Sequence, residues 1–243
     1  LPNGDKLVAD FAEGKMEGAG QYFFRNGDKY RGEIRNGIQN GQGFYEYANG
    51  DKYEGGWRDG MQEGTGKYSY SNGDLYVGDW REGKRHGRGK MAFANGDIYE
   101  GSWAHNEKEG EGVYVTADKI KYIGQFSKGE PSGRCQLVFA SGDIYEGELR
   151  KMQKHGKGKL VLATGEEYVG DWADDKKHGH GEYYDRETGE RFKGEFANDK
   201  RSGKGLYIYD NRDEYEGNWR EDERNGYGVY RFHDGDEIGR AHV

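Results

Sequence analysis

The sequence repeats a five-residue motif, Tyr-x-Gly-x-Trp, at a fixed interval along nearly its whole length. Successive copies begin at Tyr53, Tyr76 and Tyr99, each 23 residues after the last. Units in the same phase begin near Leu7, Tyr30, Tyr53, Tyr76, Tyr99, Tyr122, Tyr145, Tyr168, Phe192 and Tyr215. A fixed period of this length indicates a repeat protein, whose units pack on their neighbours instead of closing around one globular core. We therefore predict that 1–243 is a single solenoid of about ten tandem units, with no separate catalytic domain.

One unit, residues 53–75, has the pattern of a β-hairpin. In a strand, Tyr53, Gly55 and Trp57 lie on one face, because successive side chains alternate between the two faces. A turn at 59–63 leads to a second alternating segment, which ends at an Asn-Gly pair. Asn-Gly is a strong hairpin signal, because both residues tolerate positive φ. The sequence thus predicts an all-β fold without helix: an elongated single-layer antiparallel meander, a twisted rod of tandem hairpins.

The two faces of this meander differ in composition. One carries tyrosine, glycine and tryptophan, and the other carries charged and small polar residues. We expect the rings to lie across the bare glycine backbone of neighbouring strands, an arrangement similar to aromatic rescue of strand glycines. Because a single-layer sheet cannot cover its own aromatic row, we predict an exposed groove that binds partners. The predicted groove residues are Tyr53, Trp57, Tyr76, Trp80, Tyr99, Trp103, Tyr168 and Trp172.

Several positions depart from the pattern. The turn position seven residues after the first aromatic is usually Gly, Asn or Asp, which tolerate left-handed backbone, but Met152 does not fit. Cys135 stands where other units have the second glycine of Gly-x-Gly. We predict that residues 117–162 form the most irregular stretch of the array. One extra residue in the eighth unit predicts a longer hairpin loop at 185–189.

Composition narrows the class of protein. With 34% charged and 32% hydrophobic residues the chain could be disordered, but disordered chains have no reason to space aromatics regularly. A net charge of −8 argues against a nucleic-acid partner. The single cysteine excludes an intramolecular disulfide and fits a reducing compartment. No apolar run approaches the ~20 residues of a membrane span, so we expect a cytoplasmic location.

No group of residues in the sequence makes a convincing reactive site. The acidic runs at 174–175 and 221–223 fall in turns, where solvated carboxylates are expected instead of an acid/base pair. His178 and His180 lack the further ligands that zinc needs. The Gly-x-Gly pairs lead into no helix, which phosphate binding requires, and Cys135 is best explained as a small-residue replacement. We predict no catalytic residue, no metal and no cofactor.

Basic residues gather at one turn edge. Lys84, Arg85 and Arg88 are the candidate contacts for anionic lipid, at about 1 kcal/mol per basic residue near a membrane surface. Nearby acids partly cancel this charge, so a solvated edge is the favoured interpretation. The opposite edge repeats an aspartate, at Asp28, Asp51, Asp74, Asp97, Asp143 and Asp213.

The repeated unit resembles the MORN repeat (membrane occupation and recognition nexus). The resemblance rests on Tyr-x-Gly-x-Trp, Gly-x-Gly and Asn-Gly-Asp in order, as at 76–80, 87–89 and 95–97. It implies a non-enzymatic scaffold for protein–protein interaction, located in a cytoskeletal structure such as the cell cortex, a basal body or an axoneme. A partner helix in the aromatic groove or a second copy of the array would be the ligand. Two alternatives remain open: a phosphoinositide-binding module, and a regulatory array of a larger protein.

The carboxyl-terminal end is the predicted site of self-association. The last complete unit is followed only by an Asp-Gly-Asp turn and a broken unit start at 237–239, so its rings are expected to lack a cap. Members of the resembled family homodimerise, and a two-fold axis would cover both ends at once. We predict a tail-to-tail homodimer through 192–235. Its anchors are Tyr215, Trp219, Tyr230 and Phe232.

Overall fold

The computed structural model describes residues 4–235 and 237–239, and these form β-strands and turns without a helix. Each repeat is a hairpin of a seven-residue first strand and a nine-residue second strand. The first strands are β1 (Lys6–Ala12), β3 (Lys29–Arg35), β5 (Lys52–Arg58), β7 (Leu75–Arg81), β9 (Ile98–Ala104), β11 (Lys121–Ser127), β13 (Ile144–Arg150), β15 (Glu167–Ala173), β17 (Arg191–Ala197) and β19 (Glu214–Arg220). The second strands are β2 (Lys15–Phe23), β4 (Ile38–Glu46), β6 (Met61–Ser69), β8 (Lys84–Ala92), β10 (Glu107–Val115), β12 (Glu130–Val138), β14 (Gln153–Val161), β16 (Lys176–Tyr184), β18 (Lys200–Ile208) and β20 (Glu223–Arg231). The predicted all-β hairpin repeat is confirmed.

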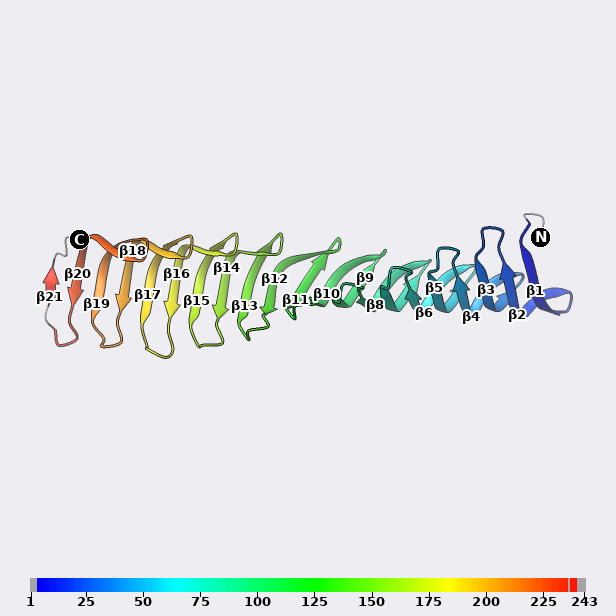
Figure 1. The fold of residues 1–243 in the computed structure, drawn as a ribbon, viewed down its shortest axis with the longest axis horizontal. Helices are drawn as coiled ribbons and strands as arrows, with labels where there is room; N and C mark the ends of the chain where they lie inside the picture. The colour runs from blue at the N-terminus through cyan, green and yellow to red at the C-terminus, as the bar shows by residue number, and fades with distance from the viewer. Residues whose placement is uncertain (1–3, 236, 240–243) are drawn as a thin grey trace. The chain divides into compact units, whose positions relative to one another are not determined.

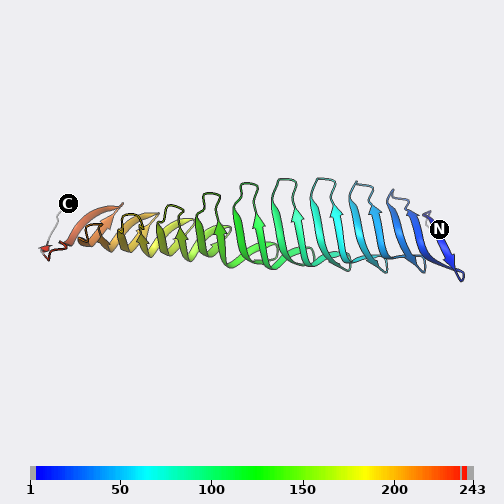
Figure 2. The same cartoon turned by 90° about the horizontal axis from the view of Figure 1, so that it is seen from below.

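The chain forms two compact units. The first comprises Leu1–Ala117 with Phe126–Glu130, and the second comprises Asp118–Gln125 with Pro131–Val243. Within each, consecutive strands pair antiparallel, from β1 to β10 in the first and from β12 to β20 in the second. Neighbouring arrows therefore alternate in direction in Figures 1 and 2. The boundary falls in the segment that the sequence singles out as irregular. The single solenoid and the rod stay predictions.

A bulge recurs in every hairpin of known register, at the first glycine of Gly-x-Gly. In the third repeat Gly55 pairs with Gly66, but Trp57 pairs with Gln62, so β6 has extra residues there. Gly64 lies in this bulge with φ +75°. Bulges of this kind bend the strand and require backbone that glycine adopts most easily.

The second glycine of the motif has a different role. A Cβ on Gly66 would lie 2.4 Å from Oη of Tyr53, and one on Gly55 would lie 2.5 Å from the Cα of Gly66. The Tyr53 ring therefore lies flat on the backbone of two glycines, and its Oη donates to the carbonyl of Gly56 at 2.9 Å. This confirms the prediction that rings pack across bare glycine.

Two consecutive residues with positive φ occur in the turn within each hairpin, and not in the Asn-Gly-Asp turn where the sequence led us to expect them. Asp59 and Gly60, between β5 and β6, both have positive φ (49° and 79°), as a type I′ turn requires, and the turn is shorter than the predicted 59–63. At the Asn-Gly-Asp turn only the glycine is left-handed, with Gly73 at 96°. The expectation that Asn72 also has positive φ is wrong. Instead its side-chain Oδ1 accepts a hydrogen bond from the Asp74 amide at 3.0 Å.

The irregular positions follow their local sequence. Met152 adopts φ +64° in a two-residue turn, and Lys119 adopts φ +68° where most other repeats have glycine. The longer loop predicted at 185–189 is confirmed, because the Gly189 amide donates to the carbonyl of Asp185 and the Asp185 amide to that of Glu190.

At the carboxyl-terminal end, β21 (Glu237–Gly239) adds backbone pairings to β20. The strand expected from the sequence to be the bare edge is thus paired along part of its length. Asp236 of the predicted Asp-Gly-Asp turn lies outside the described residues. Nothing among the described residues is a helix long and apolar enough to cross a membrane.

Candidate functional site

The tyrosines and tryptophans of the first strands form a continuous zigzag within each compact unit. The Tyr53 ring makes T-shaped contacts with Trp57 of its own repeat, at 5.3 Å, and with Trp80 of the next, at 5.1 Å. The pattern continues through Tyr76 and Trp103. Such contacts stabilise a pair by about 0.5–1.5 kcal/mol beyond burial.

These rings are core residues, which corrects the prediction of an exposed groove. The exposed fraction is 0% for Tyr53 and 7% for Trp57, the most exposed of the predicted set. The set comprises Tyr53, Trp57, Tyr76, Trp80, Tyr99, Trp103, Tyr168 and Trp172, all of which are buried. The structure brings neighbouring members together as predicted, but as the interior of the array instead of its surface. We call the side of the sheet that carries them the aromatic face.

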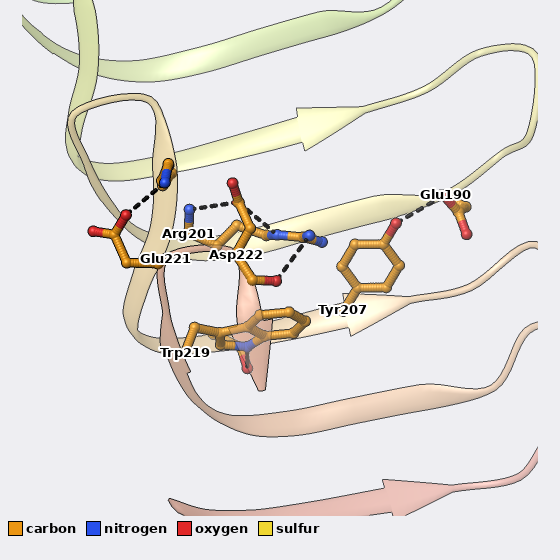
Figure 3. Close-up of polar contacts among 8 residues, drawn as sticks. Glu190, Arg201, Tyr207, Trp219, Glu221 and Asp222 are labelled. Carbon is orange, nitrogen blue, oxygen red and sulfur yellow. Dashed lines mark hydrogen bonds and ion pairs between the residues drawn. The ribbon is translucent and has the colours of Figure 1, made fainter. Parts of the chain in front are cut away.

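A row of cations, not predicted from the sequence, covers the buried rings. The Arg201 guanidinium carbon lies 4.6 Å from the centre of the Trp219 ring and 4.9 Å from that of Tyr207. Its Nε donates to Oδ1 of Asp222 at 3.1 Å, and Nη2 donates to the Asp222 carbonyl at 3.1 Å. Figure 3 shows the guanidinium beside Asp222 and near both rings. A single-layer sheet thus shields its aromatic row with the stems and heads of long basic side chains.

The same repeat position supplies the other cations. Register explains the placement, because Arg85 pairs with Trp80 across the hairpin and therefore shares its face. The members of this cation row are Arg85, Lys108, Lys154, Lys177, Arg201 and Arg224. The signal was present in the sequence, as a Lys or Arg placed second in the second strand of six repeats.

Burial and neighbouring acids act in opposite directions on these cations. Burial lowers the pKa of Lys108, Lys154 and Lys177, and the negative charge of nearby acids raises it again. Lys154, for example, lies near Asp175, whose Oδ1 also accepts from its backbone amide at 2.9 Å. The acidic turn residues therefore balance the charge of the cation row.

A second line of rings, close to the Asn-Gly-Asp turns, is only half-buried on the aromatic face. Tyr47 and Tyr70 each pack in a tilted arrangement against the ring two residues earlier, with ring centres 4.4 Å apart. Burial raises the pKa of Tyr47 to about 12, so its hydroxyl stays protonated. We call this line the rim rings. Its members are Phe24, Tyr47, Tyr70, Phe93, Phe139, Tyr209 and Phe232.

The repeated aspartates are structural. Asp51 Oδ1 accepts from the Ser71 amide at 2.7 Å and Oδ2 from the Tyr68 hydroxyl at 2.9 Å, which ties one turn to the next. Asp97 makes equivalent bonds to Tyr114 and Ala117, and these hold its pKa below the usual range. The edge that carries the repeated aspartates is therefore a ladder of hydrogen bonds between successive repeats.

The three candidate lipid contacts do not share a surface. Arg85 lies over the Trp103 ring at 4.6 Å and donates to the carbonyl of Asn106, so it belongs to the cation row. Lys84 and Arg88 are exposed. Arg88 lies on the opposite face, next to Asp79, which accepts from its amide at 2.8 Å. Strand alternation separates Arg85 from Arg88, because the two are three residues apart, and the two extra residues of the bulge at Gly87 leave that alternation unchanged.

The four predicted dimer anchors divide in the same way. Tyr215 and Trp219 are 1% and 5% exposed, so they belong to the core of their own repeat. Tyr230 and Phe232 are half buried, with ring centres 5.0 Å apart. The Tyr230 hydroxyl donates to Oδ2 of Asp213 at 2.8 Å. Only the last two present ring surface to a partner.

The other candidates carry no reactive chemistry. Cys135 is buried, and burial raises the pKa of its thiol to about 11, opposite to what a nucleophile needs. No three His, Cys, Asp or Glu residues cluster as metal ligands within the described part of the chain. Asp222, one of the acidic turn residues, is occupied by Arg201.

The opposite face is less polar than expected. Its sequence pattern predicts charged and small polar residues, but Val77, Val169 and Tyr227 lie there with 49%, 50% and 63% of their surface exposed. Val169 lies over a hollow in the second unit, described below.

Comparison with known proteins gives one family and several distant structures. A family model described as MORN repeat matches residues 9–29, 30–52, 53–75, 76–98, 99–119, 122–144, 145–167, 168–186, 192–214 and 215–237. No curated protein matches the sequence significantly. The TCP10 domain of Danio rerio CPAP, solved with a peptide of Danio rerio STIL, is 13% identical, with 98% of this chain and 100% of that chain covered and a TM-score of 0.47.

Two related structures give similar values. The G-box domain of the microcephaly protein CPAP is 16% identical, with 84% of this chain and 100% of that chain covered and a TM-score of 0.47. The SAS-4 TCP domain of Drosophila melanogaster, solved with a proline-rich motif of Ana2, is 15% identical, with 73% and 84% covered and a TM-score of 0.36. At these identities and TM-scores we draw no functional inference from them.

Proposed function

Because the chain belongs to the MORN-repeat family, we propose that it is a non-enzymatic scaffold that holds partner proteins on its aromatic face. The supporting observation is that each compact unit repeats, on one face, a line of half-buried rim rings beside a row of cations. Rings and arginines that are partly desolvated are the residue types that dominate protein interfaces. The setting that we propose is cytoplasmic and cytoskeletal, at the cell cortex, a basal body or an axoneme.

The contact residues differ from those expected from the sequence alone. Tyr53, Trp57 and their equivalents hold the array together, so a partner helix or strand meets the rim rings and the stems of the cation row. Tyr70 and Phe93 are neighbouring rim rings of the first unit. Tyr70 also accepts from Nη1 of Arg85 at 3.3 Å, which links the ring line to the cations.

This function can be tested on the exposed half of the aromatic face. We expect Tyr70→Ala together with Phe93→Ala to reduce the amount of partner protein that is cross-linked to this chain in cells and recovered with it at least about tenfold. The reason is that a hot-spot ring contributes roughly 2 kcal/mol or more to the free energy of binding. The control is Val77→Ala, which removes a side chain of 49% exposure from the opposite face. If the double variant has a wild-type circular dichroism spectrum and still recovers the same cross-linked partner proteins, the aromatic face is excluded as their binding site.

The alternative function, binding of anionic phospholipid, is favoured by the exposure of Lys84 and Arg88. Vesicles containing a phosphoinositide separate the two functions. Lys84→Glu with Arg88→Glu should abolish sedimentation with vesicles if lipid is the ligand, and should leave protein partners in place if it is not.

A further inference from the structure

The opposite face of the second compact unit contains a hollow of about 710 Å³ whose lining includes five lysine and arginine side chains. It lies over the strands from β12 to β18, which are consecutive in Figure 1. Its floor is the backbone of the strand glycines, whose missing Cβ positions point to the aromatic face. The basic lining residues are Arg134, Lys157, Lys159, Lys193 and Lys204, and the other polar side chains are His180, Glu182 and Glu195. We call this surface the basic hollow.

The lining is positive although the whole chain has a net charge of −8. Three of the lysines reach acids on neighbouring strands: Lys157 to Asp171 at 2.6 Å, Lys159 to Glu167 at 2.8 Å, and Lys193 to Glu182 at 2.6 Å. The Lys193–Glu182 pair is exposed, whereas Asp171 and Glu167 are only 33% and 20% exposed. Because exposed pairs stabilise little, a ligand carboxylate can replace Glu182 at small cost. Arg134 and Lys204 lie in no ion pair within the described ranges, 4–235 and 237–239.

Apolar side chains accompany the cations. Val169 lines the basic hollow and is 50% exposed. An adjoining hollow shares Lys193 and Lys204 and adds Leu206 and Tyr227, and Tyr227 is 63% exposed. Large exposed apolar side chains on an otherwise charged sheet face mark a contact surface. The ligand must therefore combine negative charge with apolar side chains.

We propose that the basic hollow binds an extended acidic peptide segment of a partner protein, with apolar residues placed between its carboxylates. The strands from β12 to β18 span six spacings, roughly 29 Å at about 4.8 Å each, which an extended chain of about nine residues covers. The lining is recessed and includes two glutamates, and this fits a narrow segment better than the plane of a bilayer. This site is separate from the aromatic face, so it concerns a second partner.

The test uses the full chain and a fluorescent nine-residue peptide in which each leucine follows two acidic residues. Fluorescence anisotropy should show binding to the wild type that weakens as salt is added. Arg134→Glu with Lys204→Glu should weaken it at least about tenfold, because two attractive charges become repulsive. Val169→Asp should weaken it as well. The matched control is Lys67→Glu with Lys90→Glu, exposed positions on the same face of the first unit, and should change the affinity less than about twofold.

Several outcomes would overturn the proposal. Among them are no binding of the acidic peptide at millimolar protein, equal loss in the Lys67 and Lys90 control, and equal binding of a peptide with lysine in place of its acids. Vesicles of anionic lipid, or single-stranded RNA, that bind more tightly than the peptide and lose binding in the Arg134 and Lys204 variant would assign the hollow to those ligands instead. The aromatic-face variants of Tyr70 and Phe93 should leave peptide binding unchanged.

Discussion

At the scale of single residues, the two glycines of each Gly-x-Gly motif are required for different reasons. Gly64 has φ +75°, and a Cβ added to it would meet nothing within 4 Å, so its backbone conformation is the constraint. Gly66 has ordinary φ but touches the Tyr53 ring, so space is the constraint. The first glycine of the motif is therefore required for its backbone conformation, and the second for the space that it leaves to the tyrosine ring.

This difference predicts that asparagine destabilises the two positions by different amounts. Gly64→Asn should reduce the free energy of unfolding by less than about 1 kcal/mol, because asparagine tolerates left-handed backbone. Gly66→Asn should cost about 1–3 kcal/mol or more, because it overpacks a buried ring. Urea unfolding followed by tryptophan fluorescence measures both. Equal losses in the two variants would contradict the assignment.

Met152 is a residue-scale defect in a regular turn. It adopts φ +64° as a non-glycine residue, and its side chain is 47% exposed, so little packing offsets the strain. Met152→Gly should raise the free energy of unfolding by about 1 kcal/mol. Gly83→Met, at the equivalent position of an ordinary repeat, should lower it by a similar amount. A thermal unfolding series checks both, and a stabilised Gly83 variant would refute the argument.

At the scale of the hairpin, the aspartate ladder connects each repeat to the next. The pKa of Asp51 is lowered: burial raises it, but bonds from the Ser71 amide and the Tyr68 hydroxyl outweigh that effect. A carboxyl whose folded pKa lies below its unfolded value stabilises the fold above the unfolded pKa. That contribution is lost as pH falls through the folded pKa.

We therefore expect stability to fall as the pH drops below about 4, the ordinary pKa of aspartate. Asp51→Asn should flatten that dependence, and Asp51→Ala should cost about 1–3 kcal/mol at pH 7, since it leaves the Tyr68 and Ser71 donors without their acceptor. The measurement is urea unfolding from neutral to strongly acidic pH. An Asn variant with the full wild-type slope would show that the ladder carboxylates are not its source.

The hairpin is also the scale at which the sequence was most informative. Alternation predicted the strands and the shared face of Tyr53 and Trp57, since both depend only on local period. It could not predict the bulge at Gly64, because nothing in the alternation shows an inserted residue. Arg85 and Arg88 were grouped because they share a turn edge, although alternation over three residues already places them on opposite faces. Burial of the rings was also missed, because it depends on basic side chains from the neighbouring strand.

At the scale of the whole molecule, self-association through the carboxyl-terminal repeats remains a prediction. Phe232 offers a test, because it is only half-buried and Phe93 occupies the equivalent position of an internal repeat. Phe232→Glu should convert a tail-to-tail dimer into a monomer, whereas Phe93→Glu should leave it dimeric. A buried ring at such a contact contributes roughly 2 kcal/mol or more, about a thirtyfold change in dissociation constant.

Light scattering across a dilution series gives the mass of each variant. A wild-type chain that is monomeric at every concentration would reject the dimer. A Phe232 variant that dimerises as tightly as the wild type would place the contact elsewhere.

The nearest-neighbour pattern of contacts has a mechanical consequence. The ring contacts and aspartate bonds described above join residues of the same or adjacent repeats, so no long-range contact among them locks distant hairpins together. Tension between the ends of such a meander peels its hydrogen bonds away a few at a time instead of shearing a whole strand pair at once. Each hairpin released adds roughly 80 Å of slack, at about 3.5 Å for each of its residues. We therefore expect the array to yield stepwise at low force and to act as an extensible tether.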